Sequence, residues 1–148
     1  MAMEPIDGVL EACLYAADLD AADRFYTQVL GLERFSSVPG RHVFFRCGRG
    51  MFLVFNPEST SSEASVVGGA LVPTHGATGA GHVAFAVPDA DIPAWRARLE
   101  TAGVAIESEV RWPRGGRSLY LRDPAGNCVE LASPRLWGLP DVERRGGN

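Results

Sequence analysis

The feature that most constrains the fold is an internal repeat, because a pattern used twice in one chain implies one unit of structure built twice. Five pairs of similar or chemically related residues recur at nearly constant spacing. The pairs at 71 residues are Glu11 and His82, Asp18 and Asp89, and Asp20 and Asp91; Arg46 and Arg122 are 76 apart, and Pro57 and Pro134 are 77 apart. The increase in spacing along the chain is what loop insertions in the second repeat would produce. Chance is a poor explanation for five such matches.

Each repeat predicts a strand, a helix and two further strands. Alternating apolar and polar residues predict a strand at 9–16. A helix should follow, with Asp18 and Asp20 as capping residues, an apolar stripe at helical spacing, and Gly31 at its end. The corresponding strand of the second repeat covers residues 81–87, with a helix that opens at Asp89 and Asp91 and ends at Gly103. The remaining predicted strands are 41–47, 51–55, 117–122 and 128–132.

We therefore expect one domain, residues 1–148, made of two repeats at about 8–57 and 80–134. Residues 56–81 are rich in Gly and Ser and show no period, which predicts a long connection: a linker between units, a lid, or both.

Composition excludes several classes of function. The 148 residues are 46% hydrophobic and 22% charged, with a net charge of -4 and no basic stripe, which argues against nucleic acid or an anionic membrane as a partner. No apolar stretch approaches a membrane span and no signal peptide is evident, so we expect a cytoplasmic protein. Three cysteines without CxxC spacing predict free thiols.

Strand alternation predicts a metal site. In the first strand Leu10, Leu14 and Ala16 should face the helix, which leaves Glu11 on the opposite face of the sheet; the same argument places His82 and Glu130 there. The repeat partner of Glu130 is Leu53, or Phe52 if the register slips by one residue. Three protein ligands with open positions are typical of a catalytic metal site.

Three stretches together resemble a known family. They are the helix ending Phe25-Tyr26-Thr27-Gln28-Val29-Leu30-Gly31-Leu32, the strand from Gly81 to Val87, and the ending Arg122-Asp123-Pro124-Ala125-Gly126-Asn127-Cys128-Val129-Glu130-Leu131. They resemble the vicinal oxygen chelate superfamily, which includes glyoxalase I, bleomycin- and fosfomycin-resistance proteins and extradiol dioxygenases.

The resemblance implies an α+β fold in which paired βαβββ modules form an open, cupped mixed β-sheet with helices on its outer face, often in a homodimer. By family position the metal ligands are Glu11, His82 and Glu130, although many relatives carry histidine at the position of Glu11. The further glutamate of glyoxalase I falls at Phe52 or Leu53.

The ligand set favours a divalent-metal-dependent enzyme that binds a small oxygen-rich substrate through vicinal oxygens. Mn²⁺, Zn²⁺, Ni²⁺, Co²⁺ and Mg²⁺ all fit two carboxylates and one imidazole. We expect a glyoxalase-like lyase or isomerase, or a fosfomycin-resistance-like epoxide-opening transferase, with Glu11 or Glu130 transferring protons. The alternatives are a metal-free drug-binding protein of the bleomycin-resistance type, and an extradiol-type dioxygenase in which His75 or His42 adds a second histidine.

Five further residues are candidate substrate contacts. The predicted strand 117–122 places Ser118 and Tyr120 on one face, and the repeat pairs them with His42 and Phe44. Arg117 follows a Gly-Gly turn and could bind an anionic group.

Overall fold

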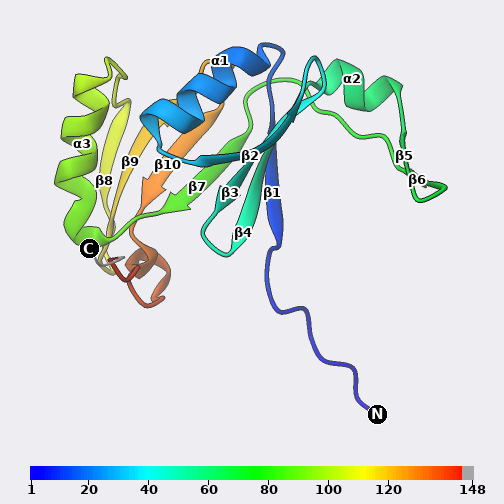
Figure 1. Ribbon diagram of the computed structural model, residues 1–148. Coiled ribbons are helices and arrows are strands. Elements are labelled where there is room, and N and C mark those ends of the chain that lie inside the picture. Colours follow the sequence, from blue (N-terminus) through cyan, green and yellow to red (C-terminus); the bar gives the residue numbers. More distant parts are fainter. Residues whose placement is uncertain (145–148) are drawn as a thin grey trace. The chain divides into compact units, whose positions relative to one another are not determined.

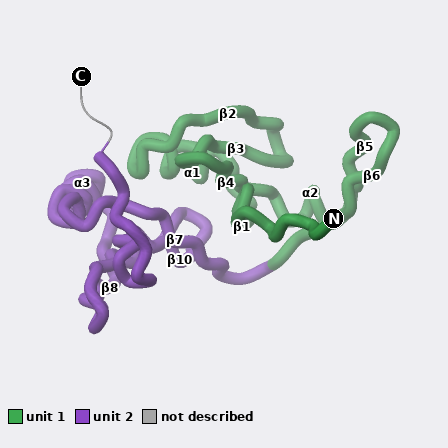
Figure 2. The backbone as a smooth tube through the Cα atoms, turned by 90° about the horizontal axis from the view of Figure 1, so that it is seen from below, with its two compact units in different colours: residues 1–77 green, residues 78–148 purple. Residues whose placement is uncertain are grey.

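The computed structural model describes residues 1–144. They form two compact units that divide between residues 77 and 78, within the predicted connection (Figure 2). Each unit is described by itself. No helix in residues 1–144 is long and apolar enough to cross a membrane.

Unit 1 contains one four-stranded mixed sheet, with a helix between its first two strands. The strand order is β1-β4-β3-β2, with β1 parallel to β4 and the other pairs antiparallel. Its elements are β1 (Glu11–Tyr15), α1 (Leu19–Arg24), the π-helical η1 (Phe25–Val29), β2 (Glu33–Val38), β3 (His42–Cys47), β4 (Gly50–Phe55), α2 (Pro57–Ser62), β5 (Ser65–Val67) and β6 (Ala70–Val72). Figure 1 labels the strands and the helices α1 and α2.

Unit 2 repeats this arrangement. Its sheet has the order β7-β10-β9-β8, again with the first strand parallel to the last. The elements are β7 (His82–Ala86), the 3-10 helix η2 (Asp89–Asp91), α3 (Ile92–Thr101), β8 (Ser108–Arg111), β9 (Arg117–Arg122), β10 (Cys128–Ala132) and η3 (Pro134–Trp137). The predicted α+β class, with open mixed sheets built twice from the same module, is confirmed.

Each sheet buries one face under its helix. In unit 1 the ring of Tyr26, fully buried, lies 5.6 Å from that of Phe45 and 4.8 Å from that of Phe52. In unit 2, α3 contacts β9 and buries Ile92 and Leu99 completely. Aromatic and aliphatic burial on this face leaves the opposite face of each sheet for the candidate site residues.

The predicted helix ends are largely correct. The Asp18 carboxylate accepts a hydrogen bond from the Ala21 N–H, as an N-cap should. Gly31 and Gly103 have φ of 75° and 70°, a conformation that terminates helices. The second helix differs, because Asp89–Asp91 form a 3-10 turn and α3 begins only at Ile92.

The predicted connection 56–81 contains secondary structure of its own, namely α2 and the hairpin of β5 and β6. Asn56 caps α2, and the Arg41 guanidinium donates hydrogen bonds to Ser59 on α2 and Ser65 on β5. Helices and strands this short show no detectable hydrophobic period in the sequence.

One expectation is wrong. Leu10, which was expected to face the helix, precedes β1 and is 75% exposed.

Candidate metal centre

In unit 2, neighbouring strands bring His82 and Glu130 together. β7 and β10 are parallel, with His82 opposite Cys128 and Ala84 opposite Glu130. Residues two apart on a strand share a face, so His82 and Glu130 project from the same side of the sheet. The His82 Nε2 atom lies 3.4 Å from Glu130 Oε2. Glu130 is buried, at 6% exposure, whereas His82 is exposed.

The other ring nitrogen of His82 is already bound. Nδ1 lies 2.9 Å from the carbonyl oxygen of Cys128. Because a carbonyl oxygen only accepts hydrogen bonds, Nδ1 carries the hydrogen, and in the neutral ring Nε2 carries the lone pair. Histidines that ligate metals are oriented in this way by a second hydrogen bond. The backbone of β10 therefore presents a metal-competent nitrogen toward Glu130.

The spacing of this pair fits one bound ion. Nitrogen and oxygen donors each about 2.0–2.2 Å from a metal stand roughly 3.0–3.5 Å from each other. The observed 3.4 Å between Nε2 and Oε2 lies in that range and is long for a direct hydrogen bond. The distance between these two atoms is therefore compatible with a divalent ion bound between them.

The second oxygen of Glu130 is held from β9. The Ser118 hydroxyl donates to Oε1 over 2.5 Å, and the Trp112 indole Nε1–H donates to the Ser118 oxygen over 2.8 Å. Tyr120 pairs with Glu130 across β9 and β10, and its ring stacks near that of His82 with centroids 6.4 Å apart. Burial, followed by the negative charge of Glu130, raises the pKa of Tyr120 above 10.0, so its phenol is protonated at neutral pH.

The corresponding positions of unit 1 carry one carboxylate and an apolar surface. Glu11 opens β1, pairs with Met51 and is exposed. Cys13 pairs with Leu53, which also pairs with Phe44, just as Ala84, Glu130 and Tyr120 pair in unit 2. Leu53 rather than Phe52 is therefore the repeat partner of Glu130.

An aromatic cluster shares the Glu11 face of unit 1. The rings of His42 and Phe44 stack with centroids 3.8 Å apart, and Phe44 contacts Phe55 edge-on at 5.3 Å. His75 packs on Phe55 at 4.7 Å, and its Nδ1 is 2.7 Å from the Tyr15 hydroxyl. Sequence patterning identified His42 and Phe44 but not the link between Tyr15 and His75, which joins residues 60 positions apart.

Arg117, a predicted substrate contact, is engaged within unit 2. Its Nη2 donates to the Asp89 carbonyl oxygen over 2.6 Å and lies 3.2 Å from an Asp89 carboxylate oxygen. An anionic substrate would have to compete with Asp89 for this guanidinium, and the contact with substrate stays a prediction.

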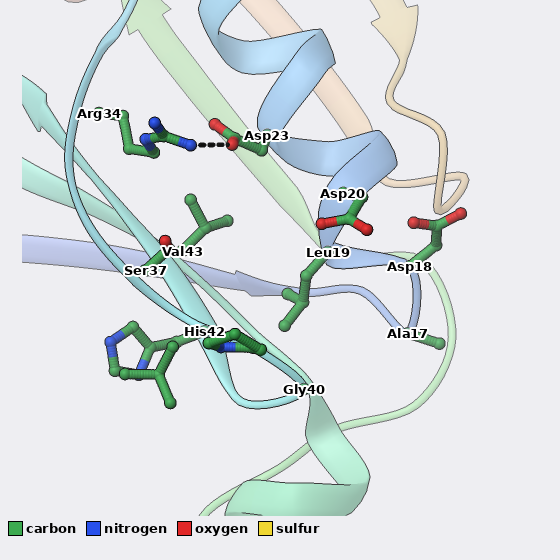
Figure 3. Close-up of a pocket in the computed structure, with 12 residues that line it drawn as sticks. Ala17, Asp18, Leu19, Asp20, Asp23, Arg34, Ser37, Gly40, His42 and Val43 are labelled. Carbon is green, nitrogen blue, oxygen red and sulfur yellow. Dashed lines mark hydrogen bonds and ion pairs between the residues drawn. The ribbon is translucent and has the colours of Figure 1, made fainter.

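A cavity of about 580 Å³ in unit 1 lies apart from the predicted ligands (Figure 3). It is bounded by the start of α1 and by the β2–β3 turn, and His42 is the predicted site residue among its walls. Two of its carboxylates have structural partners: Asp18 caps α1, and Asp23 is paired with Arg34 at 2.7 Å, as Figure 3 shows.

Within residues 1–144, no three histidine, cysteine, aspartate or glutamate side chains are grouped closely enough to form a complete ligand set. The three cysteines are free, as predicted.

Comparison with known proteins identifies the family. The model of the Glyoxalase/Bleomycin resistance protein/Dioxygenase superfamily matches residues 8–131. The chain belongs to this superfamily. As a member, it is similar to the crystal structure of lactoylglutathione lyase from Agrobacterium tumefaciens, with 44% identity, a TM-score of 0.86, and coverage of 92% of this chain and 100% of that one.

The chain also resembles more distant proteins. Fosfomycin resistance protein FosX from Mesorhizobium loti is 23% identical with a TM-score of 0.59, covering 86% of this chain and 92% of that one. A candidate ring-cleaving dioxygenase, MhqE, from Bacillus subtilis (strain 168) is 28% identical over 119 residues, 74% of this chain. The chain spans only 36% of the length of MhqE.

Proposed function

We propose that this superfamily member is a divalent-metal-dependent lyase or isomerase whose small substrate binds the ion through two neighbouring oxygens. One observation carries the proposal: His82 presents Nε2 toward the buried Glu130 carboxylate at 3.4 Å while its Nδ1 is fixed by the Cys128 carbonyl. A buried carboxylate that faces an imidazole nitrogen is a favourable place for a cation, because burying a carboxylate without a counter-charge is costly. Glu11, at the repeat position of His82, is the proposed third ligand.

Two carboxylates and one imidazole would hold Mn²⁺, Zn²⁺, Ni²⁺, Co²⁺ or Mg²⁺. When bound, such an ion supplies Lewis-acid polarisation of substrate oxygens. The single histidine among the proposed ligands argues against oxygen activation, which commonly uses two histidines and one carboxylate.

Of the two carboxylates, Glu11 is the better candidate for proton transfer. Glu130 is buried and one of its oxygens is held by Ser118. Glu11 is exposed at the start of β1, so its side chain can change position without breaking a buried hydrogen bond. We therefore assign proton transfer mainly to Glu11 and metal binding mainly to Glu130.

The substrate contacts proposed beside the metal are His42, Phe44 and Tyr120, whereas Arg117, which Asp89 already engages, stays a predicted contact. The stacked rings of His42 and Phe44 offer a flat surface on the Glu11 face, and the Tyr120 phenol lies beside the proposed ligands, hydrogen-bonded to Glu130. The relative with 44% identity is named for lactoylglutathione, so a thioester of this kind is our first candidate substrate. The epoxide-opening reaction rests on the resemblance alone.

The test is metal content and turnover in four proteins. Wild type purified without chelator should contain a divalent metal by elemental analysis, and should process lactoylglutathione in a way that chelation abolishes. His82→Ala and Glu130→Gln should each weaken metal binding by more than about 100-fold, because each removes a ligand. Glu11→Gln should lose turnover at metal concentrations that restore occupancy.

Glu33→Gln is the matched control, since Glu33 is an exposed strand glutamate with only a 3.7 Å contact to Arg46. It should bind metal and turn over as wild type does. Normal metal binding by both His82→Ala and Glu130→Gln would refute the site. A wild type that binds drug-like ligands but no metal would support the metal-free binding alternative instead.

A ring-cleaving dioxygenase is the second candidate, favoured by the likeness to MhqE. His42 and His75 lie on unit 1 and could add imidazoles, although His75 is bound to Tyr15 and His42 is stacked on Phe44. Oxygen uptake with Fe(II) and catechols, lost in His42→Ala or His75→Ala, would establish it. We also propose a homodimer, to be tested by light scattering; a cytoplasmic location stays a prediction.

A further inference from the structure

We propose that Trp112 and Ser118 are positioning residues that fix the orientation of the Glu130 carboxylate, with Ser118 serving this role rather than binding substrate. The inference rests on the proposed metal site. It concerns a chain of three side chains, from the indole of Trp112 through the Ser118 hydroxyl to Glu130 Oε1, with distances of 2.8 and 2.5 Å.

The direction of this chain is fixed by chemistry. An indole N–H can only donate, so the Ser118 oxygen must accept from Trp112. A hydroxyl has one hydrogen, and that hydrogen is therefore directed to Glu130 Oε1, which acts as the acceptor. With its only hydrogen committed, Ser118 cannot donate to a substrate while it holds Glu130.

The consequence is an orientation for the remaining oxygen. Because Oε1 is held, Oε2 is the oxygen that faces His82 Nε2 at 3.4 Å. Ser118 is fully buried and Glu130 nearly so, and the Tyr120 phenol is a further hydrogen-bond partner of this carboxylate. A ligand whose second oxygen is held in this way binds its metal without first losing rotational freedom.

The backbone of the β8–β9 connection sets the position of Trp112. The Trp112 N–H donates to the Gly116 carbonyl over 3.0 Å, and the Gly115 N–H donates to the Trp112 carbonyl over 3.0 Å. Gly116 has φ of +86°, and a Cβ there would lie 2.8 Å from the backbone nitrogen of Leu136. The turn therefore requires glycine at position 116. It places the indole of Trp112 against the hydroxyl of Ser118, six positions further along the chain.

The first experiment uses the metal-free protein. The Trp112 indole Nε1–H resonance in a ¹H–¹⁵N spectrum is assigned by its loss in Trp112→Phe. We expect it to shift in Ser118→Ala and also in Glu130→Gln, which alters the far end of the chain, but not in Ser108→Ala. Ser108 is the control because it is an exposed serine of the same sheet. If the indole resonance does not shift in Glu130→Gln, the proposed chain of hydrogen bonds from Trp112 through Ser118 to Glu130 (the relay) is wrong.

The second experiment measures Co²⁺ affinity by calorimetry and the ligand field of bound Co²⁺ by visible absorption. Ser118→Ala and Trp112→Phe should each weaken binding by about 10–100-fold and change the spectrum, as loss of an outer hydrogen bond does. Ser118→Thr keeps the hydroxyl and should bind within a few-fold of wild type. Wild-type affinity in folded Trp112→Phe would overturn the proposal even if Ser118→Ala fails to fold.

The two experiments separate the two proposals. If wild type binds no Co²⁺, the metal-dependent function fails, while the indole response to Glu130→Gln still decides whether the relay exists. If wild type binds Co²⁺ and both relay variants bind it equally well, the function stands and the positioning role fails.

Discussion

Leu53 and Glu130 hold the same place in their two sheets. Leu53 on β4 is paired with Phe44 on β3, and Glu130 on β10 is paired with Tyr120 on β9; each also pairs with the third residue of its unit's first strand. Both are buried, at 5% and 6% exposure. One repeat thus carries a carboxylate where the other carries an aliphatic side chain, and the asymmetry predicts how each responds to substitution.

Leu53→Glu should add a carboxylate to the proposed centre, as a fourth ligand beside the two carboxylates and one imidazole proposed there. In the metal-free protein it should cost about 3–5 kcal/mol, because an uncompensated charge is buried. Added Zn²⁺ should then raise its thermal midpoint more than it raises that of wild type, as linkage requires for a tighter-binding site. Differential scanning calorimetry with and without Zn²⁺ measures both effects.

Phe52→Glu is the matched control, because Phe52 is equally buried but faces the helix. It should be destabilised without any added response to Zn²⁺. Recovery by metal in Phe52→Glu but not in Leu53→Glu would mean that the assignment of faces is wrong.

The aromatic core of unit 1 should dominate its stability. Phe52, at 1% exposure, lies 4.8 Å from Tyr26, so Phe52→Ala should lower the free energy of unfolding by about 3–5 kcal/mol. Phe35→Ala makes the same chemical change at a side chain that is 55% exposed and stacked only on Arg46, and should cost less than about 1 kcal/mol. Urea unfolding compares them, and equal losses would contradict the described core.

The pH dependence of stability should include a contribution from His42. Burial, and then the charge of Arg41, lower its pKa below 6.5, so the unfolded chain takes up this proton at a higher pH than the folded one. The contribution is complete above pH 6.5 and is lost as the pH falls through the folded-state value. His42→Phe should therefore flatten the loss of stability between about pH 7 and 5.

An NMR titration of the His42 ring measures the same shift directly, and Arg41→Gln should move its midpoint upward only in part, because burial is the larger cause. A midpoint at or above 6.5 in wild type would contradict the described environment of this ring.

Neighbouring glycines should respond unequally to alanine. Both Gly115 and Gly116 have positive φ, +103° and +86°, but only at Gly116 would a Cβ strike backbone, 2.8 Å from the Leu136 nitrogen. Gly116→Ala should therefore be less stable than Gly115→Ala by about 1–3 kcal/mol in urea unfolding. It should also shift the Trp112 indole resonance, whose loop it distorts; two equally stable variants would argue against the close approach.

The main plan of the fold was predictable because it depends on patterns that recur. The 71-residue spacing identified the duplication, and alternation on β7 and β10 put His82 and Glu130 on one face, where the structure has them 3.4 Å apart. The repeat also predicted that the position equivalent to Glu130 in the first half is Leu53 or Phe52, and the strand pairing shows that it is Leu53.

What escaped prediction depends on single contacts. β2 is mostly exposed and β8 is only four residues long, so neither has an apolar pattern. The order of residues 57–72 comes from capping by Asn56 and from Arg41, a residue distant in sequence. The hydrogen bond from Ser118 to Glu130 could not be predicted either, because strand alternation gives the face on which a hydroxyl lies but not its hydrogen-bond partner. The one feature of the sequence that pointed to it was the short hairpin that brings Trp112 near Ser118.

In both units the first strand is hydrogen-bonded to the last, and every strand pair of residues 1–144 joins strands of the same half. Each half of the chain therefore contains a complete four-stranded sheet whose strand pairs do not depend on the other half. The two halves can accordingly differ at equivalent positions. Glu130 could be kept in one half while Leu53 was accepted in the other, and the peptide between β6 and β7 keeps them at a ratio of one to one.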